Sequence, residues 1–223
     1  NPYNGAILGL VGGRRFSGAE VNRSYQIRRQ PGSAIKPFVY AAALENGYTP
    51  ESQLEDKPVL LVINGRPWQP QNYDNQYRGT VDLRTALEES INTVAVQLVQ
   101  ALGVKKVFNL MRQMGLESLV EHNRRNDLGL APLALGGLTR GVSLLELTGA
   151  YSAFVNQGVY SRPFGVLSVY NHDGKLIYRA KPHQKQVISA ATARNLTEMM
   201  QGVIERGTGI RAQIGITAAG KTG

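Results

Sequence analysis

The sequence contains no cysteine among its 223 residues. This absence excludes disulfide bonds and thiolate metal sites, and it leaves the compartment open, because a cysteine-free chain suits both reducing and oxidising surroundings. Histidine occurs only three times, at His122, His172 and His183. Since these histidines are dispersed in polar stretches, we expect surface positions rather than a metal site or a Ser-His catalytic triad.

Long apolar runs and long runs of charge are also missing. The longest apolar run near the start, residues 6–11, is far too short to cross a bilayer, and no signal-peptide pattern precedes it. Lysine and arginine occur in nothing longer than pairs, and neither zinc-finger spacing nor an aromatic RNA-binding signature is present. These absences argue against nucleic acid as a partner.

The composition that remains is that of a globular protein. Hydrophobic residues make up 42% of the chain and charged residues 18%, and the length suits one or two domains with a sizeable core. The formal net charge of +9 favours anionic partners such as lipid head groups or wall polymers, although a solubilising surface explains it equally well.

Periodicity and turn residues predict alternating strands and helices along the chain. The first half is predicted to contain a buried strand at 5–11, an extended piece at 25–28, a helix at 33–46, and an irregular stretch at 48–79 that includes a hairpin at 59–66. The second half is predicted to contain helices at 81–89, 92–101 and 104–114, a loop at 133–137, a helix at 144–156, a hairpin at 165–179, a helix at 190–206 and a final strand at 214–223. Helices clustered between strands at both ends predict an α+β domain whose sheet is assembled from distant segments.

One short stretch combines a serine with a lysine three positions later. Ser33 and Lys36 follow Pro31-Gly32 at the start of a predicted helix, where residues three apart share one side. A serine hydroxyl becomes a good nucleophile when a neighbouring base removes its proton, and a lysine can do so if burial or nearby cations lower its pKa. The simpler interpretation is that Ser33 caps the helix and Lys36 points to water.

Two further motifs favour the catalytic interpretation. Ser33 is the only serine with a lysine three positions on, Ser90 is the only serine with an asparagine two positions on, and Lys221-Thr222-Gly223 occurs once. The three motifs follow one another in the order of a known active-site pattern.

The residues around these motifs resemble the transpeptidase domain of class A, bifunctional penicillin-binding proteins. The resemblance rests on Arg29-Gln-Pro-Gly-Ser33-Ala-Ile-Lys36-Pro-Phe, Pro70-Gln-Asn-Tyr-Asp74, Gly79-Thr-Val-Asp-Leu-Arg-Thr-Ala-Leu-Glu-Glu-Ser90-Ile-Asn92 and Ala218-Ala-Gly-Lys221-Thr-Gly223. It implies a fold like that of penicillin-binding proteins and serine β-lactamases, in which a helical cluster flanks an antiparallel sheet.

The resemblance also implies roles for individual residues. Ser33 would form an acyl-enzyme with a stem peptide and release D-alanine, with Lys36 as its base. Ser90 would relay a proton to the leaving amine, and Lys221 would supply positive charge. Asn92, Thr222 and Gly223 would bind the substrate. Asn92 would hydrogen-bond its peptide group and the Lys36 ammonium, Thr222 would bind its carboxylate, and Gly223 would leave room for it beside the strand.

The implied partners are peptidoglycan stem peptides and β-lactam antibiotics, with no cofactor and no metal. The implied location is the outer face of the bacterial cell membrane, in a parent protein anchored by a transmembrane helix and preceded by a glycosyltransferase domain. We expect residues 1–223 to be an incomplete transpeptidase domain, truncated directly after Lys-Thr-Gly and lacking the C-terminal strands and helix. A second oxyanion donor would then be missing, and the chain alone would be poorly active.

Two alternatives remain open. A serine β-lactamase would hydrolyse the β-lactam, but Ile91 stands where class A β-lactamases carry an aspartate, and their deacylating glutamate is not identifiable. A non-catalytic sensor or binding domain would be acylated without forming cross-links.

Several other residues are assigned structural roles. We predict that Gly207-Thr-Gly209 forms a turn rather than a phosphate cradle, and that Glu88 and Glu89 face solvent. Trp68, Tyr73 and Tyr77 are predicted to line a substrate groove, to pack in the core or to anchor loops.

Overall fold

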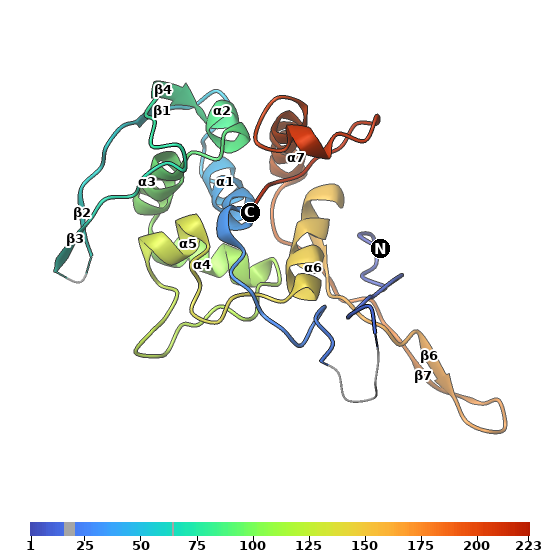
Figure 1. The fold of residues 1–223 in the computed structure, drawn as a ribbon. Helices are drawn as coiled ribbons and strands as arrows, with labels where there is room; N and C mark the ends of the chain where they lie inside the picture. Colours follow the sequence, from blue (N-terminus) through green and yellow to red (C-terminus); the bar gives the residue numbers. More distant parts are fainter. Residues whose placement is uncertain (16–20, 64) are drawn as a thin grey trace.

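The fold is described from a computed structural model, which covers residues 1–15, 21–63 and 65–223. Helices dominate this part of the chain (Figure 1). They are the 3-10 turn η1 (Gly32–Ile35), α1 (Lys36–Leu44), α2 (Leu83–Glu88), α3 (Asn92–Leu102), α4 (Val104–Gln113), α5 (Leu130–Leu135), α6 (Leu144–Val155), α7 (Ala190–Glu205) and the 3-10 turn η2 (Ile210–Ala212).

Helix α1 forms the centre of the helical cluster. Its residues 36–43 are all buried, and Figure 1 shows the other large helices arranged around it. Phe38 contacts Tyr151 edge-on and Phe154 at a tilt, each with 5.4 Å between ring centroids, which joins α1 to α6. An alanine-rich helix allows such close packing, because its small side chains let neighbouring helices approach on every side.

The strands pair locally. In the described residues, four two-stranded antiparallel sheets are present. They join β1 (Gln53–Asp56) to β4 (Gly79–Asp82), β2 (Leu61–Ile63) to β3 (Arg66–Trp68), β5 (Val159–Ser161) to β8 (Gln184–Gln186), and β6 (Ser168–Tyr170) to β7 (Leu176–Arg179). The α+β class is therefore confirmed, whereas the described residues form separate strand pairs rather than one antiparallel sheet.

The two terminal strands predicted from the sequence are wrong as assigned. In 5–11, Ala6 makes an isolated bridge with Phe164, and Leu8 and Val11 are each 81% exposed rather than buried. In 214–223, the one backbone bond to another segment within the described part of the chain is donated by the Gly220 N–H to the Met200 carbonyl. Both segments have apolar residues typical of strands, but strand geometry requires a neighbouring backbone, and among the described residues they have almost none.

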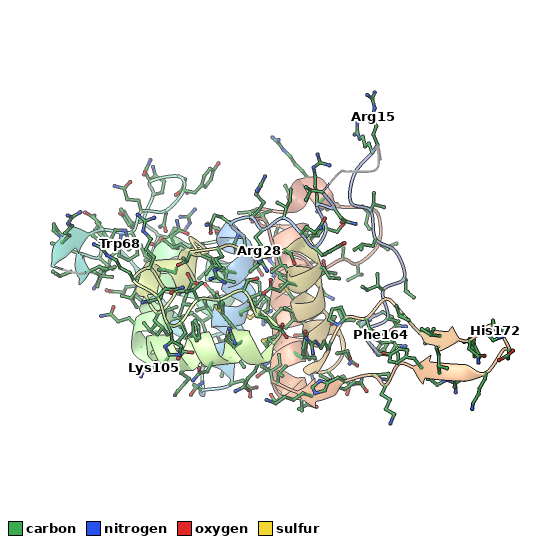
Figure 2. All side chains as sticks on the ribbon, turned by 90° about the horizontal axis from the view of Figure 1, so that it is seen from below. Arg15, Arg28, Trp68, Lys105, Phe164 and His172 are labelled. Carbon is green, nitrogen blue, oxygen red and sulfur yellow. The ribbon has the colours of Figure 1, made fainter. Side chains whose placement is uncertain are left out.

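Most predicted helices and both predicted hairpins are confirmed. The hairpin expected at 59–66 forms two residues later, as the pair of β2 and β3. Asn64, which the prediction included, lies outside the described residues. The hairpin around Asp173-Gly174 forms as β6 and β7. The two hairpins project from opposite sides of the molecule, with Trp68 near one and His172 at the tip of the other (Figure 2).

Two local assignments need correction. Residues 81–82 belong to strand β4 rather than to a helix, because Asp82 is the N-cap of α2 and accepts a hydrogen bond from the Thr85 N–H at 2.7 Å. Residues 133–135 belong to α5 rather than to a loop, and the helix ends at Gly136, which has a left-handed conformation.

The described helices are short relative to a membrane span. None of them is long and apolar enough by itself to cross a membrane, and α3 and α4, which would suffice together by length and composition, meet at an angle of 98°.

Candidate active site

Ser33 lies in the tight turn that precedes the central helix. Gly32 has φ of +53°, which lets the chain turn sharply into η1, and Lys36 is the first residue of α1. Side chains three residues apart nearly eclipse each other in a 3-10 turn, so Ser33 and Lys36 share one side. Ser33 is half-buried and does not cap the helix, since η1 has no side-chain cap.

Lys36 is the most unusual residue of this region. Its side chain is fully buried, and its Nζ donates hydrogen bonds to the Ser90 carbonyl at 2.5 Å and to Asn92 Oδ1 at 2.6 Å. Burial, with a smaller contribution from the positive charge of Lys221, lowers the pKa of Lys36 to about 6. The interpretation of Lys36 as a solvated surface lysine is therefore wrong.

A lysine with this pKa is mostly neutral at pH 7, and this limits the number of hydrogen bonds that its Nζ can donate. A neutral amine has two N–H groups and one lone pair. The Ser90 carbonyl and Asn92 Oδ1 can only accept, so they take both N–H groups. The lone pair is then left for a hydroxyl proton, and the Ser90 hydroxyl lies 3.2 Å from Nζ.

Ser90 occupies the short link between α2 and α3. Its φ of +58° lies in the left-handed region, which a serine adopts at an energetic cost of about 1 kcal/mol or more. This conformation directs its carbonyl and its hydroxyl to the same lysine, Lys36. Strain of this kind persists where the surrounding structure holds it, and it is concentrated at functional sites.

The C-terminal motif, Lys221–Gly223, also contacts Ser90. Lys221 Nζ donates a hydrogen bond to Ser90 Oγ at 2.9 Å, and burial lowers the pKa of Lys221 to about 8. Lys221 therefore remains largely charged at pH 7, unlike Lys36. The structure thus brings Lys36, Ser90, Asn92 and Lys221 into one hydrogen-bonded group.

Gly223 closes this group against the turn that carries Ser33. A Cβ atom at position 223 would lie 2.5 Å from the Pro31 carbonyl oxygen and 2.9 Å from Ala34 Cβ, so a larger residue cannot take the same place. Figure 1 shows the chain end beside α1. Thr222 is exposed next to it, and its Oγ1 lies 3.3 Å from Lys221 Nζ.

A buried polar network positions Asn92, and sequence reasoning did not assign a role to its members. Asn72 Oδ1 accepts a hydrogen bond from the Asn92 N–H at 2.9 Å. Asn72 Nδ2 in turn donates to Asp56 at 2.7 Å, and Asp56 is fully buried and accepts from Thr93 Oγ1. The Pro70–Asp74 motif contained a signal for Asn72, whereas Asp56 lacked one because its partners are distant in sequence.

The two glutamates before Ser90 have different environments. Glu89 carries 42% of its side chain in solvent and pairs with Arg78, as expected for a surface residue. Glu88 is buried, at 6% exposure, and forms two hydrogen bonds with Arg206, so the prediction that it faces solvent is wrong. The cause is α7, whose end brings Arg206 against α2 and neutralises the buried carboxylate.

The remaining predictions have mixed outcomes. The three histidines are exposed, and Gly207-Thr-Gly209 forms a turn. Trp68 packs against the edge of the core, Tyr73 is 92% exposed at a cavity beside Ser90, and Tyr77 is half-buried.

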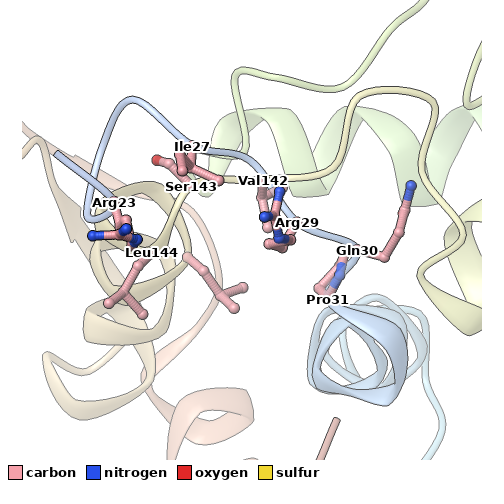
Figure 3. A pocket seen from close by; sticks show the side chains of 9 residues that line it. Arg23, Ile27, Arg29, Gln30, Pro31, Val142, Ser143 and Leu144 are labelled. Atoms are coloured by element: carbon pink, nitrogen blue, oxygen red, sulfur yellow. The ribbon is translucent and has the colours of Figure 1, made fainter. Parts of the chain in front are cut away.

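Two cavities lie close to these residues. The first, of about 250 Å³, opens beside Ser90 between the 72–78 loop and the 206–208 turn. The second, of about 330 Å³, is lined by Arg23, Arg29, Pro31 and apolar side chains such as Leu144, and it ends just before the Ser33 turn (Figure 3). Only the first cavity contains a residue of the hydrogen-bonded group.

Comparison with known proteins gives a consistent result. The family model described as penicillin binding protein transpeptidase domain matches residues 1–223. Penicillin-binding protein 1A of Pseudomonas aeruginosa is 32% identical over 277 residues, which cover 100% of this chain and 33% of that protein. The chain therefore spans about a third of the length of this relative.

Solved structures agree with the sequence match. The crystal structure of penicillin-binding protein 1A from Haemophilus influenzae has a TM-score of 0.81 at 28% identity, over 99% of this chain and 35% of that one. The imipenem acyl-enzyme complex of penicillin-binding protein A from M. tuberculosis has a TM-score of 0.75 at 27% identity, over 89% of this chain and 49% of that one.

Proposed function

The chain belongs to the penicillin-binding protein transpeptidase family, and on that premise we propose that it is a D,D-transpeptidase that cross-links peptidoglycan stem peptides through an acyl-enzyme on Ser33. The observation that carries this proposal is the fully buried Lys36 amine, which is hydrogen-bonded to Ser90 and Asn92 and whose pKa is lowered by burial to about 6. Burial on this scale is costly for a lysine, and a base at neutral pH is the chemistry that it makes available.

The first half of the reaction forms the acyl-enzyme. Ser33 Oγ attacks the carbonyl carbon of the penultimate D-alanine while its proton passes to Lys36 Nζ. The bond to the terminal D-alanine then breaks, and its amine leaves with a proton. Ser90 supplies that proton path, because its hydroxyl lies 3.2 Å from Lys36 Nζ and 2.9 Å from Lys221 Nζ.

The second half transfers the acyl group. The amine of a second stem peptide attacks the ester carbonyl, an amide bond forms, the bond to Ser33 Oγ breaks, and the proton of the amine returns to Ser33 through the same groups. Asn92 binds the peptide group of the substrate in this proposal. Lys221 and Thr222 bind its terminal carboxylate, for which a charged lysine and an exposed hydroxyl are suitable donors.

β-Lactams enter the same site in this proposal. Their strained amide replaces the scissile peptide bond, and their carboxylate meets Lys221 and Thr222. The acyl-enzyme named in the imipenem complex of the related M. tuberculosis protein supports this step. We place the activity on the outer face of the bacterial membrane, where peptidoglycan is cross-linked, in a parent protein that also carries a membrane anchor and a glycosyltransferase domain.

Mass spectrometry after treatment with penicillin tests the proposal. We expect one covalent adduct, located on Ser33, and none in the Ser33→Ala variant. An adduct elsewhere, or none on the protein at its natural length, would overturn the assignment.

Product analysis separates the alternatives. With a stem-peptide donor and an amine acceptor, a transpeptidase yields a cross-linked product, whereas a sensor is acylated and yields none. Rapid turnover of a chromogenic cephalosporin would instead indicate a β-lactamase.

A further inference from the structure

The turn formed by Gly207, Thr208 and Gly209 contacts both sides of the proposed catalytic group. Its backbone binds the helix that leads to Ser90, because the Thr208 N–H donates to the Glu88 carbonyl at 3.1 Å. Its side chain binds the C-terminal motif, because Thr208 Oγ1 lies 2.8 Å from Thr222 Oγ1. One residue thus links two segments that are far apart in the sequence.

These contacts complete a closed ring around the site. Glu88 is two residues before Ser90, Ser90 Oγ accepts from Lys221 Nζ, and Lys221 is followed by Thr222. Thr208 joins Thr222 back to Glu88. A ring of this kind fixes the distance between the Ser90 link and the Lys221–Thr222 segment, in addition to the hydrogen bond that the Gly220 N–H donates to the Met200 carbonyl of α7.

The local packing shows that the turn is anchored tightly at Glu88. A Cβ atom at Gly207 would lie 2.4 Å from the Glu88 carbonyl oxygen, so only glycine permits this approach. A Cβ atom at Gly202, one turn earlier in α7, would lie 2.0 Å from Glu88 Oε1. Arg206 pairs with the same carboxylate and holds the end of α7 against α2.

The number of hydrogen bonds that the Thr222 hydroxyl can form indicates how Thr208 affects the direction of its proton. A hydroxyl oxygen has two acceptor positions and one proton to donate. Lys221 Nζ donates to Thr222 Oγ1 at 3.3 Å, and either hydroxyl can be the donor in the bond between Thr208 and Thr222. When Thr208 is the donor, both acceptor positions of Thr222 Oγ1 are filled. The proton of Thr222 is then directed away from both and is available to a substrate carboxylate.

We propose that Thr208 is a positioning residue that orients the Thr222 hydroxyl toward the substrate carboxylate, with Glu88, Arg206 and Gly207 holding it in place. This inference rests on the proposed function, since it assigns the carboxylate of the donor stem or of a β-lactam to Thr222. In this inference, Thr208 of the Gly207–Gly209 turn contributes to the recognition of that carboxylate through Thr222.

The first test compares a penicillin with its methyl ester on the protein at its natural length. In Thr208→Val, we expect the second-order rate of Ser33 acylation by the penicillin to fall about tenfold, which corresponds to one hydrogen bond to a charged group. The ester lacks the negative charge, so its rate should change less than about twofold. Thr208→Ser keeps the hydroxyl and should restore the wild-type rate.

Matched controls and a second variant keep this test decisive. Thr217→Val changes an exposed threonine of the same C-terminal segment and should leave both rates unchanged. Gly207→Ala should lower the rate with penicillin as Thr208→Val does, while Gly9→Ala, at a position with no atom within 4 Å, should not. Equal loss with penicillin and ester, no loss in Thr208→Val, or no rescue by serine would each overturn the proposal.

Hydrogen exchange measured by mass spectrometry tests the contact without any acylation. In Thr208→Val, we expect the Gly220 amide, which is hydrogen-bonded to the Met200 carbonyl, to exchange several-fold faster than in the wild type and in Thr217→Val. Unchanged exchange would overturn the positioning role of Thr208. Absence of any Ser33 adduct in the wild type would instead overturn the proposed function, and the exchange result would still decide whether Thr208 holds this segment.

Discussion

Lys36 and Lys221 both contact Ser90, yet the regions that carry them differ in almost every respect. Lys36 belongs to the centre of the helical cluster and is fully buried, and its pKa falls to about 6. Lys221 belongs to an extended segment in which Ile214 and Ile216 are 68% and 73% exposed, and its pKa falls only to about 8. Lys36 is thus mostly neutral and Lys221 mostly charged at pH 7. The deeper burial of Lys36 is the main cause of this difference, and the positive charge of Lys221 makes a smaller contribution.

The largest expected effect comes from removing the buried lysine. Lys36→Met keeps an unbranched side chain of similar length but removes the amine, so we expect the rate of Ser33 acylation by penicillin to fall by about 10²–10⁴. Lys57→Met, at an exposed lysine, is the control and should leave the rate unchanged. A rate within a few-fold of the wild type in Lys36→Met would show that burial of this amine has no catalytic role.

Removing the buried Asp56 carboxylate, which anchors Asn72 and Thr93, should mainly lower the stability of the fold. Asp56→Ala leaves Asn72 Nδ2 and Thr93 Oγ1 without their buried acceptor, and we expect the free energy of unfolding to fall by about 3 kcal/mol. Glu55→Ala, on the exposed face of the same strand, should change it by less than about 0.5 kcal/mol. Chemical denaturation measures both, and equal effects would contradict the role of this network.

The depressed pKa of Lys36 also predicts how stability depends on pH. Between about pH 6 and 10.5, Lys36 is protonated in the unfolded chain but neutral in the folded one, so raising the pH through this window stabilises the fold. From pH 6.5 to 8.5 we expect the free energy of unfolding of the wild type to rise by about 2–3 kcal/mol more than that of Lys36→Met. Lys221 is present in both proteins, so its contribution cancels. Parallel pH profiles would mean that Lys36 is charged in the folded protein.

The smallest effect is expected on the projecting hairpin. Ile177 is 63% exposed on β7, so Ile177→Thr should change the free energy of unfolding by less than about 0.5 kcal/mol. Leu87→Ala, at a fully buried position of α2, should cost about 2–5 kcal/mol in the same assay. A large effect at Ile177 would indicate that the hairpin is packed against other residues in solution.

The sequence predicted contacts between residues close together along the chain better than contacts between residues far apart. The spacing of Ser33 and Lys36 indicates a shared side because helix geometry fixes it. The burial of Glu88 could not be predicted, because it depends on Arg206, 118 positions away. The segments 5–11 and 214–223 illustrate the same limit, since apolar composition favours a strand but cannot supply the neighbouring backbone that a strand needs.

The left-handed conformation of Ser90 has an evolutionary consequence. Glycine adopts this backbone conformation freely, so Ser90→Gly would relieve the strain and delete the hydroxyl in a single step. Stability therefore favours glycine at this position, whereas the proton transfer proposed for Ser90 requires the hydroxyl. Under the proposed function, a copy of this chain that no longer cross-links stem peptides would gain stability from this exchange without losing an activity.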